Sequence, residues 1–263
     1  MLGGSFREAS TLRSDGHLRL SEAKWEAIPF LLILRILHGQ TRAIPRKISL
    51  KTLAQVAILL DYYECYEAVE VFTHMWIRAL ETKLPTTYND DTLRWLFISW
   101  VFDERTIFKT ITAVIQANCM GVVESIGLPI PGAILDALNQ GRSDCIGRII
   151  DSLHDLFYGL VDGQFKCYYN ELELVRTHCT YTVLGAFTTH IIRMQLLSPK
   201  PKSPFLGLGV NQLLTDCRSQ MESPRHGDHK DCVLTTRIAK QLKPISAPVG
   251  LDIKREEFAA HRK

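Results

Sequence analysis

The sequence predicts a mainly helical protein with at most one or two short strands. Apolar residues recur at helical spacing over long stretches, most clearly in residues 30–72 and 131–160. Pro29 and Gly39 stand where a helix begins and ends, on either side of the first apolar run. Only residues 17–20 alternate polar and apolar side chains in the manner of a short, half-buried strand.

The first predicted helix, residues 30–38, is apolar on almost every side and has Arg35 as its one charge. Such a helix is usually buried rather than amphipathic. Ser49 is the expected N-cap of the next helix. The next two helices have narrower core stripes: Leu50, Leu53, Val56, Ala57 and Leu60 in the first, and Val69, Phe72, Trp76 and Leu80 in the second.

The breaks between these helices are distinctive. They are the His38-Gly39 stop, the Ile44-Pro45-Arg46 connector and the turn DYYECYEAV at residues 61–69. In these features the stretch resembles the second half of a BTB/POZ domain of the form common in filamentous fungi. The resemblance implies a protein–protein interaction module, with residues 1–83 as the C-terminal part of a BTB/POZ-like domain.

Residues 6–9 and 17–20 resemble the helix end and the strand that precede the third helix of this family. The chain would then begin inside the family's second helix and lack the N-terminal half of the fold. A truncated gene model or fragment is the simplest interpretation, and a divergent minimal version is the alternative. The missing half usually makes the family's dimer contacts, so the resemblance does not imply that this chain forms a dimer. Self-association of the chain remains an open alternative. We expect the N-terminal third to pack poorly.

Residues 84–221 are predicted to form a helical extension, because WLFISWVF at residues 95–102 and LPIP at residues 128–131 resemble the segment that follows this type of BTB domain. Asp90 or Asp91 is the expected cap of its first helix and Asp103 that of its second. The expected core positions of these two helices are Leu93, Leu96, Phe97 and Trp100, then Ile107, Phe108, Ile111, Val114 and Ile115.

A long helix is predicted to start at Pro131, and Gly141 and Gly147 lead us to expect a kink or break within it. Its expected core positions are Ile134, Leu135, Leu138, Cys145, Ile149, Leu153, Leu156 and Leu160. Residues 171–197 predict another helix, residues 198–209 an extended proline-rich loop, and residues 210–221 a short helix. Residues 222–263 lack clear periodicity and predict a disordered tail.

Two groups of cysteines and histidines are candidates for a metal site. Cys217, His226, His229 and Cys232 have a spacing that zinc accepts, but they lack a tight ligand pair on each side, so a solvated tail is the preferred interpretation. The second group is Cys167, His178, Cys179 and His190, whose apolar helical surroundings favour buried thiols. No metal or cofactor is therefore assigned.

No catalytic constellation emerges from the sequence. It contains no glycine-rich phosphate loop after a strand and no G-x-S-x-G motif. Cys65 has no basic neighbour that would lower its pKa, and His38 is expected to cap a helix. The acidic pairs Glu171/Glu173 and Glu256/Glu257 are expected on solvated faces. We therefore expect a protein that is not an enzyme.

The composition of the chain narrows the classes of function and the cellular locations that remain. The chain has 263 residues, is 46% hydrophobic and carries a net charge of +3, too small to indicate nucleic-acid or membrane binding. It shows neither a signal peptide nor a spanning segment, and its seven cysteines suit reduced thiols, so a cytoplasmic or nuclear protein is expected. Arg42, Arg46, Lys47 and Lys51 form a basic cluster. It has two explanations: ordinary solvated loop charges, or a contact surface for an acidic protein or RNA.

Three functional hypotheses follow. The first is an interaction module of BTB/POZ type whose protein partner is unknown. The second is a substrate adaptor of a cullin-type ubiquitin ligase, which a pull-down with cullin would distinguish from the first. The third is a zinc-binding regulator that uses the Cys/His-containing tail, for which metal analysis of the purified protein is the test.

Overall fold

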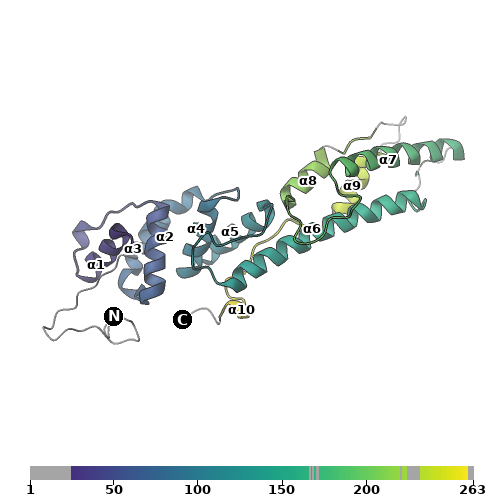
Figure 1. Cartoon of the computed structure of the whole chain (residues 1–263). Coiled ribbons are helices and arrows are strands. Elements are labelled where there is room, and N and C mark those ends of the chain that lie inside the picture. The colour runs from purple at the N-terminus through teal and green to yellow at the C-terminus, as the bar shows by residue number, and fades with distance from the viewer. Residues whose placement is uncertain are drawn as a thin grey trace. The chain divides into compact units, whose positions relative to one another are not determined.

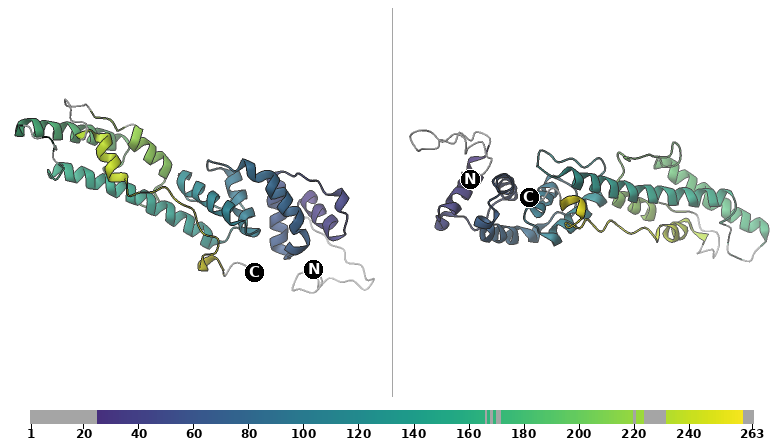
Figure 2. Two further views of the ribbon diagram at one scale, coloured as in Figure 1. Left: turned by 180° about the vertical axis from the view of Figure 1, so that it is seen from behind. Right: turned by 90° about the horizontal axis from the view of Figure 1, so that it is seen from below.

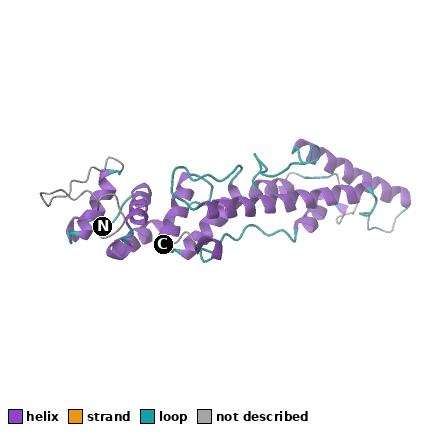
Figure 3. Cartoon of the chain, turned by 60° about the horizontal axis from the view of Figure 1, so that its bottom comes forward, coloured by secondary structure: helices purple, strands orange, loops and turns teal. Residues whose placement is uncertain are grey.

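The computed structural model describes residues 25–165, 167, 169, 172–219, 221–223 and 232–259. These residues are mainly helical, as the sequence predicts, and none of them lies in a strand (Figure 1, Figure 3). The strand expected at residues 17–20 lies outside the described residues. The chain divides into two compact units, and each is described by itself.

The first unit comprises residues 1–85, 89–108 and 126–129. Its helices are α1 (Ala27–Leu37), α2 (Leu50–Tyr63), α3 (Tyr66–Leu80) and α4 (Asp90–Val101), with the short 3-10 turns η2 (Thr41–Ala43) and η3 (Glu81–Lys83). The helix α2 is central, because it packs against α1, α3 and α4. The sequence assigned α4 to a separate extension, whereas α4 packs on α2 and belongs to this unit.

The ends of these helices follow local signals in the sequence. Ser49 caps α2 by accepting a hydrogen bond from the Thr52 amide at 3.1 Å. Gly39 has a φ of +68°, a conformation that suits glycine after a helix. The cap of α4 differs from the prediction, because Asn89 takes this position in place of Asp90 or Asp91 and forms a reciprocal capping box with Thr92.

Most of the predicted core positions of the first unit are buried. Leu53, Leu60, Val69 and Trp76 are completely excluded from solvent. The Trp76 indole N–H donates to the carbonyl of Pro45 at 2.8 Å and so ties the connector between α1 and α2 to α3. The outer positions of the predicted stripes are only half-buried, namely Leu50, Phe72 and Leu80.

The second unit comprises residues 86–88, 109–125 and 130–263. The helix α5 (Arg105–Asn118) begins in the first unit and continues into the second. It is followed by α6 (Gly132–Val161), α7 (Glu173–Arg193), α8 (Val210–Ser219), α9 (Leu234–Leu242) and α10 (Glu256–Ala259). The long helix α6 contacts α7, α8, α9 and α10, and the two longest helices, α6 and α7, lie side by side in Figure 2.

The helix α6 starts after Pro131, as predicted, but the expected break at its glycines is absent, since it runs unbroken for 30 residues. Gly141 lies against Gln116, whose Nε2 would be 2.2 Å from a Cβ atom at this position. Gly147 faces the Phe205 ring. Gly141 therefore allows the Gln116 side chain to approach α6 closely, whereas a Cβ atom at position 147 would meet the Phe205 ring at an ordinary contact distance of 3.8 Å.

The structure corrects the expectation of a disordered tail for residues 232–259. In α9, Leu234, Ile238 and Leu242 lie on one face and are buried in the core of the second unit. Downstream, the Leu251 amide donates to the Thr112 hydroxyl at 2.8 Å, and Phe258 is fully buried. The helical period was present in the sequence, but it spans only nine residues and has polar neighbours on both sides.

No helix among the described residues combines the length and the apolar character that crossing a membrane requires.

Candidate functional site

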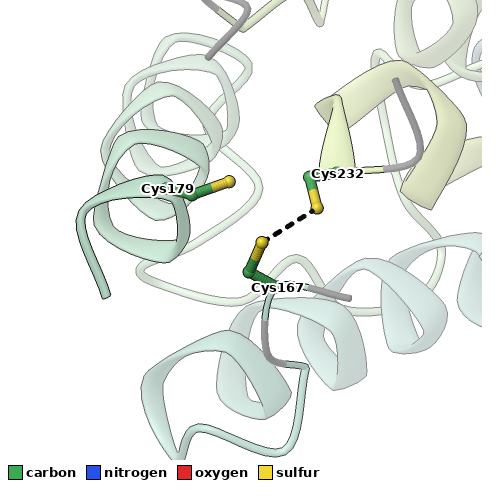
Figure 4. Close-up of side chains that lie close together, drawn as sticks. All are labelled: Cys167, Cys179 and Cys232. Carbon is green, nitrogen blue, oxygen red and sulfur yellow. Dashed lines mark hydrogen bonds between the residues drawn. The ribbon is translucent and has the colours of Figure 1, made fainter. Parts of the chain in front are cut away.

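Three buried cysteines of the second unit converge on one point. Cys167 lies in the connector after α6, Cys179 in the second turn of α7, and Cys232 just before α9. Their three sulfur atoms lie within 4.8 Å of one another. Figure 4 shows the side chains pointing toward a common centre, and the Cys232 thiol donates a weak hydrogen bond to the Cys167 sulfur at 3.6 Å. We call these residues the cysteine triangle.

The local packing explains how the triangle is positioned. Cys179 is the first residue of the buried face of α7, which continues through Val183, Phe187 and Ile191. Cys232 is held two residues before Leu234, which is buried in the core. The three cysteines form a small cluster of their own, packed with Tyr169, rather than part of the main apolar core.

The triangle combines residues from both groups that the sequence suggested. Cys232 belongs to the first group and Cys167 and Cys179 to the second. Cys217 is buried elsewhere, on the α8 face of the main core, while His226 and His229 lie outside the described residues.

Neither histidine of the second group belongs to the cysteine triangle. His178 is exposed on α7, next to Cys179 in sequence. The His190 ring Nε2 lies 2.9 Å from the carbonyl oxygen of Glu222. Among the described residues, the triangle therefore contains three potential metal ligands, all of them thiols.

The electrostatic environment of the triangle has two components. Burial, and secondly the neighbouring thiols of Cys232 and Cys167, raise the pKa of Cys179 to about 12, so its sulfur is protonated at neutral pH unless a cation replaces the proton. Arg237 on α9 is 5% exposed, and its Nε donates to the carbonyl of Cys232 at 3.3 Å. A positive charge is thereby held beside the backbone carbonyl of Cys232.

The outward face of α7 is the second feature of interest. Leu174, Tyr181 and Ile192 are spaced seven and eleven residues apart, so they lie on one side of the helix. Their exposed fractions are 81%, 67% and 57%. Between Thr177 and Ile192 the helix contains no Asp, Glu, Lys or Arg. A solvent-facing helix surface is usually charged, so this face is unusual.

The residues considered for catalysis occupy structural or solvated positions. Burial raises the pKa of Cys65, opposite to the direction that a nucleophilic thiol needs. His38 is the C-cap residue of α1, and Glu173 is exposed at the start of α7. Glu257 forms an ion pair with Arg255. Glu171 lies outside the described residues.

The basic cluster of the first unit is solvated. Arg42, Arg46, Lys47 and Lys51 are all exposed, and Lys51 forms a surface ion pair with Glu26 at 3.4 Å. Such a pair contributes little to stability. Exposed charges of this kind, three in the connector and Lys51 in the first turn of α2, are usual on a solvated surface.

Sequence reasoning missed two buried charges, Arg237 on α9 and Arg142 on α6, the second of which is 1% exposed. The Arg142 guanidinium donates at 2.7–2.8 Å to four backbone carbonyls, those of Cys119, Pro204, Phe205 and Leu208. Desolvation lowers the pKa of this group. Arg142 thus fixes the proline-rich loop against α6, and no periodic signal distinguishes it from the exposed arginines of the chain.

A scan against protein-family models, a search of curated proteins and a search of solved structures each found no match to this chain. The likeness of residues 30–72 to a BTB/POZ domain therefore stays a prediction from the sequence.

Proposed function

We propose that this chain is a non-enzymatic protein–protein interaction module that binds its partner through the outward face of α7. The observation that carries the proposal is the combination of three exposed apolar side chains, Leu174, Tyr181 and Ile192, with the absence of Asp, Glu, Lys and Arg between Thr177 and Ile192 of the same helix. Protein interfaces are depleted in charged residues at their centre and enriched in aromatic ones.

The energetic argument concerns these same three side chains. Burial of a Leu or Ile side chain stabilises a complex by about 1.5–3 kcal/mol before the costs of association. A tyrosine at the centre of such a surface is a frequent energetic hot spot. The opposite face of α7 is committed to the core through Phe187 and Ile191, so the helix holds the outward residues at fixed spacing.

The resemblance of residues 1–83 to part of a BTB/POZ domain supports the same class of function. In such a domain the N-terminal half would pack on the helix that corresponds to α1. That helix exposes Ile28 and Leu31, which are 70% and 44% accessible. We place the main partner surface on α7 because the apolar stripe there is longer and the helix has no charged residue between Thr177 and Ile192.

Site-specific crosslinking tests the proposal. A photoreactive phenylalanine analogue replaces Tyr181 in the full chain, and irradiation in cell extract is followed by mass spectrometry. The same analogue at Val249, which is 72% exposed in the second unit, is the control. A specific adduct at residue 181 that is absent at residue 249 is expected, and a second copy of this chain counts as a protein partner.

A variant that introduces negative charges on this face makes the test quantitative. Leu174→Glu, Tyr181→Glu and Ile192→Glu combined should weaken binding to the crosslinked partner by more than about 100-fold, since three apolar contacts are lost. Val249→Glu should leave binding unchanged. Equal binding by both variants, or equal adducts at both positions, would refute the assignment to α7. Identification of the partner as a cullin would assign the adaptor role.

A further inference from the structure

We propose that Cys167, Cys179 and Cys232 bind one zinc ion as thiolates. The ion would fasten the connector after α6 and the residues before α9 to α7, three segments that are distant in the sequence. This inference does not depend on the partner surface of α7.

The spacing of the sulfurs fits a tetrahedral metal better than a disulfide. Zinc–sulfur bonds of about 2.3 Å in tetrahedral geometry place ligand sulfurs about 3.8 Å apart. The Cys232 and Cys167 sulfurs are 3.6 Å apart, and all three lie within 4.8 Å of one another. A disulfide requires about 2.05 Å between sulfurs and would leave the third cysteine unused. None of the three cysteines forms a disulfide in the structure.

Ordinary burial of cysteine does not explain the triangle. Cys145 and Cys217 show the usual behaviour, in which a thiol packs as a small apolar group among isoleucine and leucine side chains of the main core. The triangle cysteines instead gather with one another in a separate cluster whose only described apolar neighbour is Tyr169. Convergence of three thiols from three segments is the arrangement that a soft divalent cation selects.

The chemistry of binding balances without an oxidant. Each thiol loses its S–H proton to solvent as a zinc–sulfur bond forms, so one ion displaces three protons and no atom changes oxidation state. Three thiolates and Zn²⁺ carry a net charge of −1. The guanidinium of Arg237, which donates to the backbone carbonyl of Cys232, would partly offset this charge. One tetrahedral position remains for a neutral ligand.

The first experiment measures zinc in the full chain, purified under reducing conditions and given equimolar zinc. About one zinc per chain is expected. Cys167→Ser, Cys179→Ser and Cys232→Ser should each weaken zinc binding by more than the roughly 100-fold that loss of an outer-shell partner costs. Cys217→Ala, a matched buried cysteine on α8, should bind like the wild type. Absence of zinc in the wild type, or full retention in the three serine variants, would overturn the proposal.

A second experiment uses the unaltered chain and so does not depend on the folding of variants. Cobalt replaces zinc, and the intensity of the sulfur-to-cobalt charge-transfer band counts the thiolates. A band for three thiolates is expected, and its absence would overturn the proposal. Addition of a chelator should lower the thermal midpoint and the amide protection of α9. Mass spectrometry that shows a disulfide within the triangle of the zinc-treated, reduced protein would also refute zinc binding.

Discussion

The two units of this protein are stabilised in different ways. In the first, the successive helices α1, α2 and α3 pack on one another, and Leu53, Leu60 and Trp76 fill the core at positions of simple helical period. In the second, contacts between distant residues close the structure. Arg142 and Phe205 are 63 residues apart, Cys167 and Cys232 are 65 apart, and Thr112 and Leu251 are 139 apart.

This difference teaches where a sequence is informative. A helical stripe follows from residues three and four apart, so it can be recognised locally. A closing contact is chosen by the three-dimensional fold, and forming it costs the entropy of closing a long loop. No local pattern identifies the two residues that meet.

The largest effect is expected from ending the chain at Ser223. This deletion removes Leu234, Ile238, Leu242 and Phe258, each at most 2% exposed. At about 1.5–3 kcal/mol for each side chain, the loss is about 6–12 kcal/mol, comparable with the stability of a whole domain. We therefore expect α6 and α8 to lose their amide protection, measured by hydrogen exchange.

The matched control for this deletion is Lys240→Ala, which changes an exposed residue of α9. It should alter stability by less than about 0.5 kcal/mol. Unchanged protection of α6 and α8 in the truncated chain would show that residues 232–259 are dispensable, and the contrast between the two units would fail.

Arg142→Met should have the next largest effect. The change leaves four carbonyls without their donor, including those of Pro204 and Leu208. A buried carbonyl without a partner costs about 1–3 kcal/mol, and relaxation relieves part of the sum, so we expect a loss of about 3–5 kcal/mol. Urea unfolding measures it. Arg148→Met, at an exposed position of the same helix, is the control, and an equal loss in both variants would contradict the role of Arg142.

The sequence predicted some of these features and missed others for definite reasons. The Ser49 cap, the Gly39 stop and the buried faces of α2 and α4 depend on residues within one or two turns, and the structure confirms them. Reasoning from the sequence missed α9, because the apolar face of this helix has only three members. It also missed the cysteine triangle, because both proposed ligand groups were assembled from neighbours in sequence. The BTB/POZ resemblance stays a prediction.

Two glycines sharpen the comparison further. Gly250 in the second unit has a φ of +82°, and a Cβ there would come 2.0 Å from the backbone carbonyl oxygen of Lys109. Gly39 in the first unit has a φ of +68° but open space around it. Gly250→Ala combines strain with a collision and should cost about 2–5 kcal/mol, whereas Gly39→Ala should cost about 1–2 kcal/mol.

Thermal unfolding of the two alanine variants compares a closing contact with a local helix end. A smaller loss for Gly250→Ala than for Gly39→Ala would mean that the segment around residue 250 is not packed as the structure shows.

The smallest effects are expected at the helix caps of the first unit, where each signal is local. Ser49→Ala removes the acceptor for the Thr52 amide, and Asn89→Ala removes the acceptor for the Thr92 amide, both at 3.1 Å. Each change should lower the free energy of unfolding by about 0.5–2 kcal/mol, and Ser49→Gly by only a few tenths. Chemical denaturation of the three variants measures these differences. Because Ser49 is exposed, water can reach the freed amide, which limits the loss. A loss above about 3 kcal/mol for Ser49→Ala would show that a distant contact, rather than the cap alone, depends on this residue, and would remove the distinction between the two units.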